Sequence, residues 1–165
     1  LERIESAAQG PAELFCPLDL IHDVVASLAP LTAGKEHTLT IHLPETRPRI
    51  RGASALLREA FLNLVDNAIK YTKAGGEVQI RCLQNGESVT LEVQDSGIGI
   101  AEKELTRIFE RFYRVDRARS RDMGGTGLGL SIVKNLTQAF GGTVGVESQL
   151  GKGSTFRITL RRGKK

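Results

Sequence analysis

Hydrophobic residues recur along the chain with two spacings, one typical of helices and one typical of strands. Apolar positions three and four apart predict helices that start at Asp19 and that cover about 53–71 and 128–140. Alternating apolar and polar positions predict half-buried strands over 37–43, 77–83, 88–94, 143–148 and 154–160. We also expect a frayed helix over 1–9 and a short helix from about Glu102. The mixture predicts an α/β (α+β) two-layer sandwich, with a mixed, largely antiparallel sheet covered on one face by helices.

Glycine and proline predict where these elements end. Pro30 and Gly34 are expected to end the helix that begins at Asp19, and Gly141-Gly142 to end the last helix. Asn85-Gly86 lies between two alternating segments and predicts a hairpin with a tight primed turn.

Composition limits the classes of protein that remain. The chain has 165 residues, enough for one domain with a core, and 40% of them are hydrophobic. It has no run of about 18 apolar residues and no signal peptide, so we expect no membrane contact by this domain. Cys16 and Cys82 lack metal-ligand spacing, and we expect two buried or free thiols in a reducing compartment.

The net charge of +4 raises the question of nucleic-acid binding. Much of the excess lies in the last five residues and in the arginines of 107–121. No aromatic-basic readout motif accompanies them. We therefore expect no nucleic-acid partner and interpret the basic end of the chain as a frayed, solvated tail.

Four glycines within residues 124–129 precede the last predicted helix. Glycines at this place are typical of a phosphate held near a helix N-terminus. A dinucleotide fingerprint would need glycine at 130 or 132, where Leu130 and Ile132 stand. A P-loop fails as well, because Lys152 is followed by Gly153 instead of serine or threonine.

Polar side chains line one face of the helix predicted over 53–71. Glu59, Asn63 and Asn67 are spaced four apart, and Lys70 lies nearly one turn beyond. Asparagines are poor helix formers and costly to bury without a partner. They could cap neighbouring backbone, or an amide oxygen could bind magnesium while Lys70 meets phosphate.

A carboxylate ends the strand predicted over 88–94. Asp95 only accepts hydrogen bonds when ionised, so it suits the exocyclic amine of adenine and would repel the carbonyl of guanine. Gly97 and Gly99 follow and would let backbone approach a flat ring closely. Alone, this pattern is common turn chemistry.

Five motifs occur together and in order: N-x-x-x-N-A-x-K-Y (63–71), DSGIGI, FERFYR, GGTGLGLSI and GKGSTF. Their order and spacing resemble the N box, first glycine box, F box, second glycine box and final glycine box of sensor histidine kinase catalytic domains. These domains share a Bergerat-type ATP-binding fold with type II topoisomerase, mismatch-repair and heat-shock chaperone ATPases. The resemblance covers about residues 14–160.

The resemblance implies a role for each matching position. Asp95 would bind adenine, and Asn67 would bind Mg²⁺ with Asn63 beside it. Lys70 and Arg114 would contact the phosphates, and Asn63, Lys70 and Arg114 would be the catalytic residues. Phe109 and Phe112 would anchor a lid over ATP, which is expected at about 109–127. The other residues expected to contact the nucleotide are Tyr71, Gly97, Ile98, Gly99, Ile100, Gly125, Thr126, Gly127, Leu128, Gly129, Leu130 and Thr155. Arg117, Arg119 and Arg121 are expected to be solvated in the lid, with partner contact as the lesser alternative.

Asn63 bears on the class of reaction. In ATP-hydrolysing relatives the matching position is typically a glutamate base, whereas an amide cannot take a proton. The resemblance therefore implies an ATP-dependent protein-histidine kinase domain, with relay of the phosphate to a response regulator. The alternatives are an anti-sigma-type protein-serine kinase or ATPase, and a non-catalytic nucleotide-binding or interaction module.

The phospho-accepting histidine is expected outside this chain, because His22, His37 and His42 lack the context of an acceptor motif. All three are expected at the surface. Residues 1–13 resemble the end of an upstream dimerisation helix and a linker, and 14–165 the catalytic domain. We expect this piece to be monomeric and cytoplasmic, within a longer protein anchored in the cell membrane.

Overall fold

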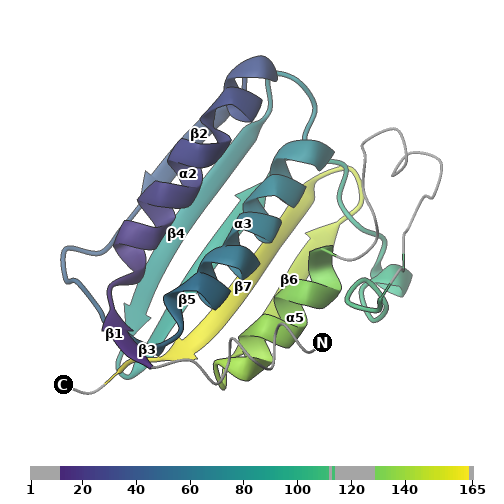
Figure 1. Ribbon diagram of the computed structural model, residues 1–165. Helices are drawn as coiled ribbons and strands as arrows, with labels where there is room; N and C mark the ends of the chain where they lie inside the picture. The colour runs from purple at the N-terminus through teal and green to yellow at the C-terminus, as the bar shows by residue number, and fades with distance from the viewer. Residues whose placement is uncertain (1–11, 112, 114–128, 164–165) are drawn as a thin grey trace.

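A computed structural model describes residues 12–111, 113 and 129–163 (Figure 1). The lid is thus largely outside the described residues, as is the helix expected over 1–9. A five-stranded sheet has the order β2-β4-β5-β7-β6. Its strands are β2 (Thr38–His42), β4 (Glu77–Asn85), β5 (Ser88–Asp95), β6 (Thr143–Gln149) and β7 (Gly153–Arg161).

Three helices cover one face of this sheet, α2 (Pro17–Gly34), α3 (Ser54–Tyr71) and α5 (Gly129–Ala139). The central helix α3 packs against both of the others (Figure 1). Strand β2 runs parallel to β4 because α3 lies in the crossover between them, and the remaining pairs are antiparallel. The predicted two-layer sandwich with a mixed, largely antiparallel sheet is confirmed.

The core lies between the two layers. The apolar positions with helical spacing on α3 are buried, as are alternate apolar positions of the neighbouring strands β5 and β7. These residues are Leu57, Phe61, Leu64, Val65, Ala68, Ile69, Val89, Leu91, Val93, Phe156, Ile158 and Leu160. The opposite face of the sheet is polar, and Glu92 there joins Arg81 and Arg157 through ion pairs of 2.9 and 2.7 Å.

The predicted helix end at Gly34 and the predicted hairpin with a primed turn are confirmed, but two details are wrong. Pro30 lies inside α2 instead of ending it; it is exposed, so water can satisfy the carbonyl that its missing N–H leaves unbonded. In the hairpin, Asn85 pairs with Ser88, so the two turn residues are Gly86 and Glu87. Gly86 takes a φ of 61°, which the first central residue of a type II′ turn requires.

A second, two-stranded sheet was not predicted. Strands β1 (Glu13–Phe15) and β3 (Ile50–Gly52) pair antiparallel near the C-terminal end of α5. Each has three residues, too few for an alternating pattern to be visible in the sequence. The short helix expected near Glu102 is a single 3₁₀ turn, η1 (Glu102–Glu104).

The chain's last described residues are not frayed, contrary to expectation. The N–H of Arg162 donates to the carbonyl of Glu87 (2.6 Å), and the N–H of Gly163 donates to that of Arg49 (2.7 Å). Cys16 and Cys82 are free thiols, half-buried and buried respectively. No helix in the described part of the chain has the length and apolar character to cross a membrane.

Candidate nucleotide-binding site

Asp95 ends β5 and is 9% exposed. One carboxylate oxygen, Oδ1, accepts hydrogen bonds from the N–H groups of Gly97 (2.9 Å) and Ser154 (3.2 Å). The other oxygen accepts none from the residues that the structure describes, so it remains available to an outside donor. Burial raises the pKa of Asp95, while the bonds from Gly97 and Ser154 oppose that rise.

The glycines after Asp95 are required by the protein's own packing. A Cβ on Gly97 would lie 2.8 Å from Oδ1 of Asp95 and closer still to the carbonyl oxygen of Tyr71. Gly99 has a φ of 72°, and a Cβ there would overlap the carbonyl of Gln149. Gly97 and Gly99 were expected to let backbone approach a flat ring. In the structure, Gly97 leaves room for the Tyr71 carbonyl and the Asp95 carboxylate, and Gly99 leaves room for the Gln149 carbonyl.

The loop that carries these glycines is hydrogen-bonded to the end of α3 and to β6. The N–H of Ile98 donates to the carbonyl of Tyr71 at the end of α3 (3.2 Å). The N–H of Ile100 donates to Oγ of Ser148 on β6 (2.7 Å), and Ser148 in turn bonds to Oγ of Ser154 (2.7 Å). Tyr71, Ile98 and Ile100 therefore hold the Asp95 loop between α3 and the β6–β7 hairpin.

The polar face of α3 leads away from this loop. Nδ2 of Asn63 donates to the carbonyl of Glu59 (3.0 Å). The side-chain amide of Asn67 has no hydrogen-bond partner among the described residues, which leaves its oxygen available to a ligand. Lys70 pairs with Asp66 at 2.9 Å, and both side chains are about one-third exposed. Sequence reasoning missed Asp66, although its spacing of four from Lys70 is that of a helical ion pair.

Helix α5 begins beside Asn63. A Cβ on Gly129, the first residue of α5, would lie 3.7 Å from Oδ1 of Asn63. The N–H groups of a first helical turn have no partners within the helix and attract anions. Leu130 follows, half-buried against the core. The structure thus brings Asn63 and the N-terminal end of α5 together, on the side of α3 where phosphates were expected.

Thr155 does not lie with the other predicted residues. Along β7, Ser154, Phe156 and Ile158 are buried toward the helices, so the intervening Thr155 is on the opposite face of the sheet. Its neighbour Ser154 is the residue that donates to Asp95. Ser154 could have been predicted from the sequence, because it is two residues before Phe156, which was expected to face inward, and residues two apart on a strand share a face.

The aromatic motif is described only in part. Phe109 is half-buried, and its ring meets that of Phe156 edge-on with centroids 6.2 Å apart. This contact attaches the expected beginning of the lid to the core. Six predicted residues lie outside the described part of the chain, namely Phe112, Arg114, Gly125, Thr126, Gly127 and Leu128.

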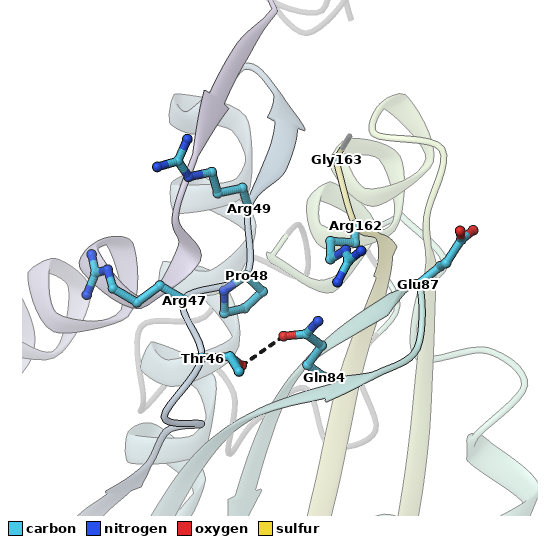
Figure 2. A pocket seen from close by; sticks show the side chains of 8 residues that line it. All are labelled: Thr46, Arg47, Pro48, Arg49, Gln84, Glu87, Arg162 and Gly163. Carbon is cyan, nitrogen blue, oxygen red and sulfur yellow. Dashed lines mark hydrogen bonds between the residues drawn. The ribbon is translucent and has the colours of Figure 1, made fainter. Parts of the chain in front are cut away.

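A cavity of about 680 Å³ lies elsewhere, beside the β4–β5 turn (Figure 2). Its lining includes Gln84 and Arg162, which are near the ends of β4 and β7 that lie farthest from Asp95. The seven residue steps along β5 from Ser88 to Asp95 separate the two places by roughly 23 Å. The cavity is therefore separate from the predicted site. At its edge, the side chain of Arg47 points toward α2 and pairs with Asp19 at 2.9 Å.

Comparison with known proteins decides the family. The profile described as "Histidine kinase-, DNA gyrase B-, and HSP90-like ATPase" matches residues 52–164. The chain belongs to this ATPase family. Its five motifs and its fold are those of the ATP-binding catalytic domain of sensor histidine kinases, as predicted.

Individual relatives of this ATPase domain are sensor histidine kinases. Sensor histidine kinase RppB of Synechocystis sp. is 43% identical over 97% of this chain, which spans 36% of RppB. The crystal structure of full-length ShkA in complex with AMPPNP superposes with a TM-score of 0.85 and 30% identity, over 99% of this chain and 34% of that one. The catalytic domain of histidine kinase ThkA has the same fold, with a TM-score of 0.81 and 24% identity over 92% of this chain and 97% of that one.

Proposed function

We propose that this ATPase domain binds Mg-ATP between α3, the Asp95 loop and α5, and presents the γ-phosphate to a histidine on a separate dimerisation domain. The phosphate would then pass to an aspartate of a response regulator. The observation that carries the proposal is the buried carboxylate of Asp95. Two backbone N–H groups hold its Oδ1, while its second oxygen accepts no hydrogen bond from the described part of the chain.

Asp95 would select adenine. Its unbonded oxygen is an acceptor, which matches the exocyclic amine of adenine and opposes the carbonyl of guanine. Because Gly97 and Ser154 hold the other oxygen in place, the acceptor is preorganised before the base arrives. Preorganisation lowers the entropic cost of binding.

The phosphates would extend along α3 toward the first turn of α5. The Asn67 amide oxygen fits a magnesium ion that takes its other ligands from phosphate and water, because Mg²⁺ commonly uses few protein ligands. Bound Mg²⁺ would neutralise charge on the transferring phosphate. Lys70 has three N–H donors, so it can keep Asp66 and still meet a phosphate, and we assign Arg114 to the same charge from the sequence motif.

The amide of Asn63 favours transfer over hydrolysis. Its nitrogen donates to the Glu59 carbonyl, and a carboxamide cannot remove a proton from water. A neutral histidine carries its own lone pair and needs no such base. We therefore expect slow ATP turnover in the absence of an acceptor, which separates this function from that of an ATPase of the same family.

The test is transfer of labelled γ-phosphate in the full-length protein, scored as acid-labile, base-stable label on histidine. Asn67→Ala should reduce transfer by at least tenfold, and raising the Mg²⁺ concentration should recover part of it. Asn85→Ala, at the far end of the sheet, is the matched control and should behave as wild type. Equal transfer by both variants would contradict the assignment of Asn67.

A further inference from the structure

Lys35 follows the last residue of α2, and its side chain reaches the C-terminal end of α3. Its ammonium group donates to three main-chain carbonyls, those of Ile69 (2.8 Å), Lys70 (2.9 Å) and Thr72 (2.9 Å). A lysine ammonium has three N–H donors, so all three are used. Lys35 is half-buried, and its partners are two residues of the helix that carries Asn63, Asn67 and Lys70, together with Thr72, the residue that caps that helix.

The three carbonyls need such a partner. The last four carbonyls of an α-helix have no N–H within the helix, and they form the negative end of its dipole. Within the described residues, the carbonyl of Ile69 also accepts a long main-chain bond from the N–H of Thr72 (3.4 Å), and Lys35 bonds it at a shorter distance. A single cation held by three carbonyls therefore closes the end of α3.

The carbonyl that Lys35 leaves out is the one that faces the nucleotide site. The Tyr71 carbonyl lies between those of Lys70 and Thr72 in sequence, yet it accepts from the N–H of Ile98 (3.2 Å) and lies against Gly97. The end of α3 is thus divided, with one carbonyl turned to the Asp95 loop and its neighbours turned to Lys35.

The residues around Lys35 hold the same segment. Nε2 of His37 donates to the carbonyls of Thr72 (3.1 Å) and Lys73 (3.0 Å). The sequence prediction that His37 is a surface histidine is therefore wrong, whereas His22 and His42 are exposed as expected. The N–H of Gly75 donates to the Lys35 carbonyl (2.9 Å), so residues 35–37 and 69–75 form one connected unit.

We propose that Lys35 is a positioning residue for the nucleotide site, which aims the Tyr71 carbonyl at the Asp95 loop by fixing the carbonyls on either side of it. Lys35 does not touch the nucleotide. It acts through the Tyr71–Ile98 hydrogen bond, which sets the distance between the adenine acceptor on β5 and the phosphate-facing side chains of α3. The expected effect of Lys35 on nucleotide binding rests on the proposed function. Its expected effect on the Tyr71–Ile98 hydrogen bond does not.

Two measurements on the 165-residue chain test it. Lys35→Met keeps the aliphatic stem and removes the ammonium; Lys73→Met removes an exposed ammonium from the same loop and is the matched control. In the nucleotide-free protein, hydrogen exchange of the Ile98 amide should accelerate at least tenfold in Lys35→Met and stay unchanged in Lys73→Met. Calorimetry of the folded variants should show a Kd for ADP about tenfold weaker in Lys35→Met only.

The outcomes separate the possible failures. If Lys35→Met unfolds more easily but its folded form keeps the wild-type Ile98 exchange and ADP affinity, Lys35 is only a structural cap and the proposal is overturned. If wild type itself does not bind ADP, the proposed function fails, and the Ile98 exchange still decides the role of Lys35. If Lys35→Met does not fold, Lys35→Gln replaces it. The same faster Ile98 exchange and weaker ADP binding are expected in Lys35→Gln, and wild-type values of both would overturn the proposal.

Discussion

Replacing Gly97 with alanine tests how tightly the Asp95 loop is packed. The added Cβ would lie 2.8 Å from Oδ1 of Asp95, 3.0 Å from the carbonyl carbon of Tyr71, and nearer still to the Tyr71 oxygen. Ordinary contacts of this kind begin at about 3.4 Å. The carboxylate and the end of α3 would therefore have to move apart from the loop by about 0.6 Å or more.

This displacement should cost stability and, to a greater degree, binding. Inserting a methyl group into a packed site costs about 1–3 kcal/mol of unfolding free energy. A shift approaching 1 Å in a preorganised site costs up to roughly a hundredfold in function. Because Asp95 and the Tyr71–Ile98 bond both move, we expect the Kd for ADP to rise between about tenfold and a hundredfold.

The assay combines urea unfolding with calorimetric titration of ADP. Gly145→Ala is the matched control, because a Cβ on this strand residue has nothing within 4 Å and should leave both quantities near wild type. If Gly97→Ala also leaves the ADP affinity unchanged, the contacts at Tyr71 and Asp95 do not hold the site, and the packing argument is refuted.

Three further results are expected. Glu92→Ala should lower the unfolding free energy by about 1–3 kcal/mol, because this 9% exposed carboxylate pairs with two arginines; Glu147→Ala, at a 74% exposed side chain, should cost little. Gly52→Ala should destabilise because its Cβ would overlap the Phe140 ring, and Phe140→Leu should relieve that loss in the double mutant. In urea unfolding at neutral pH, Asp95→Asn should have a higher unfolding free energy than wild type. The reason is that burial raises the pKa of Asp95, so its ionised form lowers the stability of the folded state. This difference in unfolding free energy should shrink as the pH falls through the raised pKa toward 3.8.

Most of the fold could be predicted because its elements carry clear periods. The helical spacing of apolar residues in α3 and their alternation along β5 and β7 agree with the burial of these residues. The errors lie where a local signal is overridden. Pro30 is tolerated in α2 because it is exposed near the helix end. Strands β1 and β3 form by pairing with each other, and three residues are too few for a sequence pattern to indicate that pairing.

The site was predicted from motifs, and its supporting contacts were not. The structure places the end of α3 against the Asp95 loop and the start of α5 beside Asn63. Lys35 could not be identified from the sequence, because its side chain bonds main-chain carbonyls whose positions depend on the fold. Ser154 donates its own N–H to Asp95, and only the inward period of its strand indicates it. Likewise, the reason for Gly97 became visible only once Tyr71 was seen beside it.

The most direct test of the central claim is calorimetric titration of the 165-residue chain and its Asp95→Asn variant with ATP, ADP and GTP in magnesium. A hydrogen bond to a charged acceptor contributes about 1.5–3 kcal/mol, which corresponds to roughly 10- to 150-fold in Kd. The account predicts binding of adenine nucleotides in preference to GTP, and a loss of that size in Asp95→Asn. Equal affinity for ATP and GTP in wild type, or unchanged ADP affinity in Asp95→Asn, would contradict it.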